Sequence, residues 1–221
     1  MKREGIAGLV GASALPEGLK AYLAAALKRR RPFSFTAALK KDPAIFLASA
    51  GRLLAGASAA LGRPEAQALF ATGFDPANLA PQRLEAAFAE LLAAMLLRGE
   101  GFSSIELIGT NSGRTADVSA ARDGLRWAFE VRCLSAPGRL DAGLLAGKFR
   151  SKLPQAANAL KKYGFDRAAV VLVRSPWDSD GFVPDPALAA LAADARARGK
   201  KKPAAHLCVL DRGRFGVAPR W

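Results

Sequence analysis

The chain has 221 residues, of which 51% are apolar, and its 33 Lys and Arg residues outnumber 19 Asp and Glu residues, giving a formal net charge of +14 at pH 7. This length allows one large domain or a domain with a smaller helical annex. The single histidine, His206, excludes a histidine-based catalytic triad and a multi-histidine zinc site within one chain.

The most apolar stretch, residues 44–62, is interrupted by Arg52 and is rich in Ala and Gly, so it lacks the ~20 consecutive apolar residues of a membrane span. It predicts a buried helix or helix pair. The N-terminus resembles a signal peptide only loosely, because Glu4 and several glycines break a short apolar run. We therefore expect a cytoplasmic protein with no membrane association, in which Cys133 and Cys208 are buried thiols of a reducing compartment.

Residues 1–80 predict an all-helical region without a convincing strand. Helices are expected over 16–31, 32–41 and 42–62, and a short helix followed by a Pro/Gly/Asn-rich loop over 62–82. The boundary is expected near Pro81. Residues 1–80 would then form an N-terminal region for DNA or partner binding, and residues 81–221 a second domain.

After Pro81 helices and strands alternate. The sequence predicts, in order, a helix over 82–99, a strand over 102–109, a polar turn over 110–114, a hairpin within 114–134, a helix over 143–164, a strand over 166–175, a helix over 185–199 and two strands within 205–218. The helix over 143–164 is expected to break before Pro154, because proline fits the first turn of a new helix. A mixed sheet with helices on both faces is the natural packing of this order, so the fold class is α/β.

The hairpin RTADVSAARDGLRWAFEVRCL carries the strongest local signal. Asp123-Gly124 tolerates the positive φ angles of a two-residue turn, and the runs on either side alternate apolar and polar residues. If Arg122 pairs with Leu125, Asp117 lies directly opposite Glu130, with Cβ atoms about 5 Å apart. On this register one face is wholly apolar and is expected to face the core: Ala116, Val118, Ala120, Leu125, Trp127, Phe129, Val131 and Cys133.

Two carboxylates that face each other across a ladder destabilise a sheet. A bound cation would offset their repulsion, since two carboxylate oxygens, a backbone carbonyl and waters are ligands that Mg²⁺ accepts. The alternative is a solvated pair on an open sheet face, without a function. The hairpin alone leaves both interpretations open.

The element order, with Asp117 followed by Glu130-Val131-Arg132, resembles the PD-(D/E)XK nuclease superfamily, whose shared core is an αβββαβ unit. The resemblance covers residues 81–175 and implies a restriction-endonuclease-like core with a mixed central sheet. It also implies a phosphodiester hydrolase that uses Mg²⁺ or Mn²⁺ and acts on nucleic acid, above all DNA. A homodimer stays open, because many of these nucleases cut both strands as dimers.

The resemblance assigns roles to matching positions. Asp117 and Glu130 match the metal-binding acids, and the carbonyl of Val131 matches a further metal ligand. Glu85, on the preceding helix, matches a glutamate that helps to hold the metal in many members. Glu90 lies about 140° round the helix from Glu85 and is expected to be a solvated charge.

Two other polar residues match less specifically. Gln155 falls where several members carry a glutamine near the substrate phosphate; otherwise it is a polar residue in the first turn of a helix. Glu106 alternates away from Ile105 and Leu107, so it is either a spare acid near the site or a charge on an edge strand.

The sequence departs from the family where Arg132 replaces the lysine of the motif, and Ala116 stands where many members have proline. Lysine can orient the attacking water or accept its proton, whereas arginine stays protonated in proteins and cannot be the base. Arg132 can still grip a phosphate oxygen with two donors and offset the negative charge that develops in the transition state.

The first hypothesis is therefore a metal-dependent endonuclease in which Asp117, Glu130 and Glu85 hold one or two ions. The second is a catalytically inactive nucleic-acid-binding or assembly protein of the same fold. The third is that residues 1–80 bind a protein partner and the positive charge is incidental. A surface this basic favours a polyanion, with nucleic acid the commonest and an anionic membrane surface the competing partner. The basic runs expected to follow a phosphate backbone are 28–31, 40–41, 148–152, 161–162 and 196–202.

Overall fold

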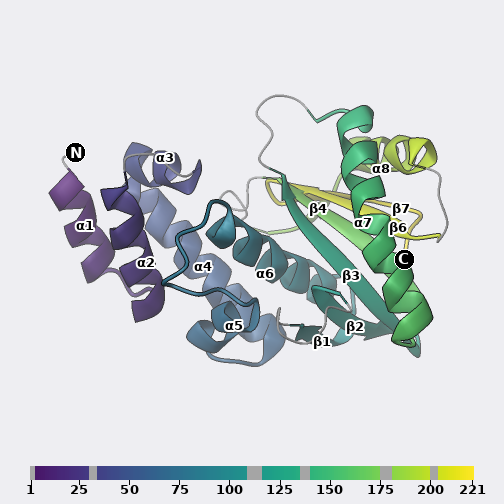
Figure 1. The fold of residues 1–221 in the computed structure, drawn as a ribbon, viewed down its shortest axis with the longest axis horizontal. Coiled ribbons are helices and arrows are strands. Elements are labelled where there is room, and N and C mark those ends of the chain that lie inside the picture. Colours follow the sequence, from purple (N-terminus) through teal and green to yellow (C-terminus); the bar gives the residue numbers. More distant parts are fainter. Residues whose placement is uncertain (1–2, 30–33, 109–115, 135–139, 175–180, 200–203) are drawn as a thin grey trace.

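The structure is a computed structural model, and it describes residues 3–29, 34–108, 116–134, 140–174, 181–199 and 204–221 (Figure 1). Within these ranges the chain forms eight α-helices and one mixed sheet of seven strands. The fold class is therefore α/β, as the sequence predicts. The polar turn expected over 110–114 lies outside the described residues.

The described part of residues 1–80 is entirely helical or loop, as predicted. Asp42 begins the longest of these helices: its backbone is extended, and its carboxylate accepts a hydrogen bond from the N–H of Ile45 at 3.0 Å, which satisfies one of the free donors of the first turn. Pro43 follows at the first helical position, where a missing N–H is not needed. The helices are α1 (Arg3–Ala12), α2 (Glu17–Lys28), α3 (Ser34–Lys41), α4 (Pro43–Leu61) and α5 (Glu65–Ala71).

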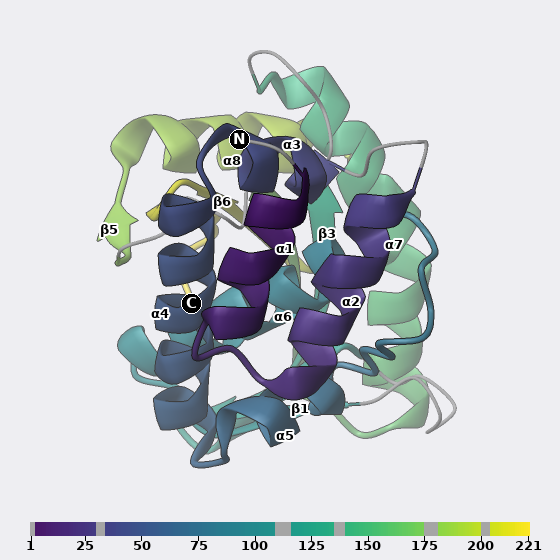
Figure 2. The same cartoon turned by 90° about the vertical axis from the view of Figure 1, so that its left-hand side faces the viewer.

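These helices share one hydrophobic core with the rest of the chain. Helix α6 (Arg83–Gly99) lies between the N-terminal helices and the sheet (Figure 1), and its buried residues surround most of its circumference. Leu54 of α4, Leu91 of α6 and Phe129 of the sheet, all 0% exposed, belong to the same cluster. Figure 2 views the N-terminal helices from outside, with α1 between α2 and α4.

Among the described residues, α4 is the one helix whose length and composition would allow it to cross a membrane. Its buried residues, among them Phe46, Leu53 and Leu54, pack into the core just described. The predicted helix is therefore present, but it is buried on one side only, and Ile45 is 64% exposed.

The sheet has the strand order β1-β2-β3-β4-β6-β7-β5. The first three strands form an antiparallel meander, β4 runs parallel to β3 and β6 parallel to β4, and β7 returns antiparallel to β6. The short edge strand β5 is not predicted by the sequence. The strands are β1 (Ser103–Leu107), β2 (Val118–Arg122), β3 (Leu125–Leu134), β4 (Arg167–Arg174), β5 (Val183–Pro184), β6 (His206–Asp211) and β7 (Arg214–Ala218).

Helices α7 (Ala142–Lys162) and α8 (Pro186–Arg198) cover the other face of the sheet (Figure 1). The expected break before Pro154 is wrong, because α7 continues through the proline. Proline removes one helical hydrogen bond. However, Phe149 and Leu153 before it and Ala156 after it all pack into one cluster beneath the helix, so burial holds both halves on the sheet.

From α6 to β4 the described elements follow the order helix, three strands, helix, strand. This order brings β2, β3 and α7 together on one side of the molecule. The predicted site residues lie where these three elements meet.

Candidate active site

The β2–β3 hairpin has the predicted turn and register. Asp123 and Gly124 have φ angles of 52° and 75°, the left-handed values that a type I′ turn requires at both central residues. Arg122 pairs with Leu125, and the ladder continues as far as Val118 opposite Phe129. The prediction from Asp123-Gly124 is confirmed over this range.

The regular ladder ends before Asp117. The sequence predicts that Asp117 pairs directly with Glu130, and the structure does not show this pair. The N–H of Asp117 donates to the carbonyl of Phe129 at 3.0 Å, and Phe129 already pairs with Val118. Two residues of one strand therefore oppose one residue of the other, which is a β-bulge. A bulge re-aims a side chain and ends regular pairing, and such irregularities are common next to active sites.

The bulge also explains a wrong prediction for Ala116. The other residues of the expected apolar face pack toward α6 and the N-terminal helices. Ala116 instead packs with Ala128 and with Ala159 of α7, on the opposite face. One inserted residue reverses the alternation of side chains beyond it.

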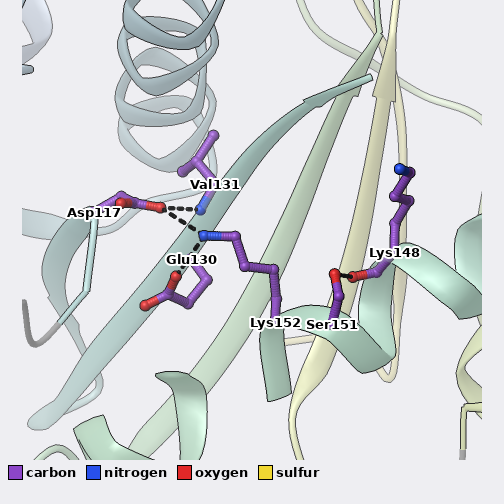
Figure 3. Close-up of polar contacts among 6 residues, drawn as sticks. All are labelled: Asp117, Glu130, Val131, Lys148, Ser151 and Lys152. Atoms are coloured by element: carbon purple, nitrogen blue, oxygen red, sulfur yellow. Dashed lines mark hydrogen bonds and ion pairs between the residues drawn. The ribbon is translucent and has the colours of Figure 1, made fainter. Parts of the chain in front are cut away.

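Asp117 and Glu130 nevertheless converge on one cation, the ammonium group of Lys152 (Figure 3). The Nζ atom of Lys152 lies 2.9 Å from Oε2 of Glu130 and 3.8 Å from Oδ2 of Asp117. The same oxygen of Asp117 accepts a hydrogen bond from the backbone N–H of Val131 at 2.7 Å. Because β3 extends beyond its last described pair with β2, the carboxylate takes the place of the carbonyl that would accept from Val131 in a longer ladder.

We call Asp117, Glu130 and Lys152 the acid–lysine cluster. Their side chains are 24%, 6% and 17% exposed, so the charges interact in a medium that screens them less than water does. One ammonium group faces two carboxylates, which leaves a net negative charge within the cluster.

The sequence pattern does not predict Lys152 as a site residue. It reaches the acids because α7 connects two parallel strands, β3 and β4, and a crossover of this kind lays its helix across the face of the sheet. Phe149 and Leu153 mark the buried side of α7, and Lys152 lies at its margin. Lys152 could be identified from the sequence only by combining two features: the crossover between β3 and β4, and the spacing of the buried residues along α7.

A cavity of about 180 Å³ adjoins the acid–lysine cluster. Asp117 and Lys152 line it together with Arg132 of β3 and with Arg83 and Glu90 of α6. Arg83 and Arg132 are both exposed, and neither forms an ion pair with another described residue. Larger cavities of 530 and 590 Å³ lie around β5 and β7 and contain no member of the cluster.

The structure brings Glu90, and not Glu85, to this cavity. Glu85 is 2% exposed and lies near Tyr22 of α2 and Cys133 of β3. Burial raises the pKa of each of these two groups to about 12, and the charge of Glu85 adds to both shifts. Helix α6 therefore buries Glu85 near both α2 and β3, and the expected grouping of Glu85 with the metal-binding acids does not occur.

Gln155 and Glu106 do not line the cavity. Gln155 is exposed, and it lies in the middle of α7 and not in a first helical turn. Its spacing of three residues from Lys152 places it on the same side of the helix. Glu106 is exposed on β1, where it pairs with Ser119 at the edge of the sheet.

The oxygen atoms at this site suit a hard divalent cation. Within the described ranges no three His, Cys, Asp or Glu side chains gather into a metal-binding group. The available donors are the carboxylates of Asp117 and Glu130 and the nearby carbonyl of Val131, a set that Mg²⁺ completes with water and phosphate oxygens. The Lys152 ammonium group already contacts both acids, at 2.9 Å from Glu130 and 3.8 Å from Asp117.

No protein-family model, curated protein or solved structure matches the chain. The residues of the cluster and the order of the elements around it are therefore the basis for any functional assignment. The cluster and these elements all lie within residues 83–174.

Proposed function

We propose that the protein is a Mg²⁺- or Mn²⁺-dependent phosphodiester hydrolase of the PD-(D/E)XK type, an endonuclease whose substrate is nucleic acid and most of all DNA. The observation that carries this proposal is the convergence of Asp117 and Glu130 on Lys152 beside a cavity lined by arginines. Two acids and a lysine are the residue types of the family's motif. Here the lysine comes from α7 instead of β3.

Asp117, Glu130 and the carbonyl of Val131 are the groups that would hold the metal. A bound divalent ion supplies a water of lowered pKa and offsets the charge of the phosphate. The hydrogen bond from the N–H of Val131 holds the Asp117 carboxylate in place, so little reorganisation is needed when a cation arrives.

Lys152 and Arg132 would together perform the roles of the family's lysine, Lys152 acting on the attacking water and Arg132 binding the phosphate. Lys152 lines the cavity beside the two acids, so its ammonium group would act on a water or a phosphate there. A lysine can orient the attacking water and exchange a proton with it, whereas Arg132 stays protonated. Arg132 is exposed at the cavity and can hold a phosphate oxygen with two parallel donors.

The same ion pairs support one alternative, a catalytically inactive nucleic-acid-binding protein. Lys152 offsets part of the charge of the two acids without any metal. A protein with a net charge of +14 would still bind nucleic acid through phosphate contacts. Its affinity would fall as salt is raised and would not depend on a divalent ion.

Nicking of a supercoiled plasmid by the full chain tests the proposal. We expect nicking with Mg²⁺ or Mn²⁺ and none with EDTA. Asp117→Asn and Glu130→Gln, which remove one charge with little change of shape, should abolish nicking and leave DNA binding unchanged or tighter. Glu106→Gln, an exposed acid outside the cavity, is the matched control and should nick normally. DNA binding without cleavage under every metal condition would contradict the nuclease and support the inactive protein.

A further inference from the structure

The N-terminal region supplies one wall of the cavity beside the acid–lysine cluster. The connection between α5 and α6 contributes Thr72, Gly73 and Phe74 to its lining, together with Asp117 and Lys152. These residues lie within the first 80 of the chain, whereas both acids and Lys152 belong to the αβββαβ part. Residues from two regions that are distant in the sequence therefore line the cavity together.

This wall is held firmly in place. Phe74 is 5% exposed, and its ring contacts that of Tyr22 edge to face at a centroid distance of 5.0 Å. Tyr22 in turn contacts Phe35 of α3 at 5.7 Å. The hydroxyl of Thr72 donates to the carbonyl of Leu69 at 2.7 Å. A wall anchored by buried rings and a local hydrogen bond does not move aside at low cost.

The cavity is small, and Asp117 forms part of its lining. Its volume of about 180 Å³ is smaller than the range of roughly 300–1,000 Å³ that is usual for ligand sites. Asp117, which is 24% exposed, lines the cavity, whereas Glu130, which is 6% exposed, does not, so a phosphodiester would enter the cavity to reach a metal held by Asp117. A paired strand can do so only by leaving its partner, which has an unpairing and unstacking cost.

The charges in the cavity suit one strand of phosphodiester. Arg83, Arg132 and Lys152 come from three different elements, α6, β3 and α7, and all line the same small volume. The acids Asp117 and Glu90 are the anionic part of this lining. A divalent ion held by Asp117 and Glu130 would offset their charge, and Arg83, Arg132 and Lys152 would then contact a phosphate.

Resting on the nuclease proposed above, we infer that this site takes single-stranded nucleic acid, or the unpaired end of a strand, in preference to an intact duplex. The N-terminal region sets this selectivity by closing the cavity with Thr72–Phe74. Arg83 positions the strand by binding a phosphate at the mouth of the cavity.

Fluorescence anisotropy with one labelled DNA oligonucleotide, either single-stranded or annealed as a blunt duplex, tests this inference. The measurement uses the full chain with Asp117→Asn in Mg²⁺ at physiological salt, so that binding is read without cleavage. We expect Arg83→Gln to weaken single-strand binding about tenfold and to leave duplex binding unchanged, because the duplex does not enter the cavity. Arg98→Gln, an exposed arginine in the last turn of the same helix, is the control and should change neither.

Equal weakening of both forms by Arg83→Gln, or no weakening of either, would overturn the inference. Cleavage by the wild-type chain supplies the second readout. Duplex cut as fast as single strand would overturn the single-strand preference while leaving the nuclease intact. Absence of cleavage on every substrate, with the Arg83-dependent binding difference present, would reject the nuclease and uphold the binding preference.

Discussion

The ammonium group of Lys152 lies 2.9 Å from the carboxylate of Glu130, whose side chain is only 6% exposed. A buried ion pair adds little stability compared with apolar packing, but removal of one partner leaves the other charge buried and uncompensated. Lys152 is therefore expected to matter for folding as well as for chemistry. The two roles can be separated by experiment.

Lys152→Met should lower the free energy of unfolding by about 3 kcal/mol, because it removes the ammonium group that lies 2.9 Å from the buried Glu130 carboxylate. Lys148→Met, at an exposed position one turn earlier on α7, should change stability by no more than about 0.5 kcal/mol. Urea denaturation followed by circular dichroism measures both. Adding Glu130→Gln to Lys152→Met should recover most of the loss; a double variant that is as unstable as the two losses summed would show that the pair is not coupled.

Lys152, and not Arg132, should be the cation on which cleavage depends most. Lys152→Ala should slow plasmid nicking by about 10²–10⁴-fold, the range for loss of a group that moves a proton. Arg132→Lys keeps a charge at the cavity and should slow nicking by about tenfold or less, since only the bidentate contact is lost. A large increase in nicking by Arg132→Lys, with little effect of Lys152→Ala, would instead place the missing lysine at position 132.

Two glycine substitutions should change stability in opposite directions. Gly124 has a φ angle of 75° in the hairpin turn, so Gly124→Ala should cost about 1–2 kcal/mol through backbone strain. Gly147 is exposed within α7 and an added Cβ would meet nothing within 4 Å, so Gly147→Ala should stabilise by about 0.5–1 kcal/mol. Thermal and chemical unfolding measure both. Stabilisation by Gly124→Ala would contradict the turn and, with it, the register that directs the two acids.

The two cysteines should be unreactive in the folded protein. Burial, together with the charge of Glu85, raises the pKa of the Cys133 thiol to about 12, and burial raises the pKa of Cys208, which is 0% exposed. Because the thiolate is the reactive form, disulfide-reagent labelling at pH 8 should be slow in buffer and fast in denaturant. Cys208→Ala isolates the signal of Cys133. Rapid labelling of native Cys133 would contradict the packing of α6 against β3.

Local chemistry of the chain determined the hairpin and the approach of its two acids. Asp123-Gly124 specifies the turn, and strict alternation on either side specifies which face is buried, because both signals come from residues that are neighbours in the sequence. The bulge at Asp117 was not predictable in this way. It depends on how the end of β2 meets β3 and α7.

Tertiary structure alone decided which other charges join the acids. Helical periodicity places Glu85 and Glu90 about 140° apart, but the rotation of α6 is set by its burial between the N-terminal helices and the sheet, and that rotation turns Glu90 to the cavity. Lys152 is 22 residues from Glu130 and reaches it only because the crossover between β3 and β4 lays α7 over this face. Such contacts depend on the packing of the whole core, which a local sequence pattern does not contain.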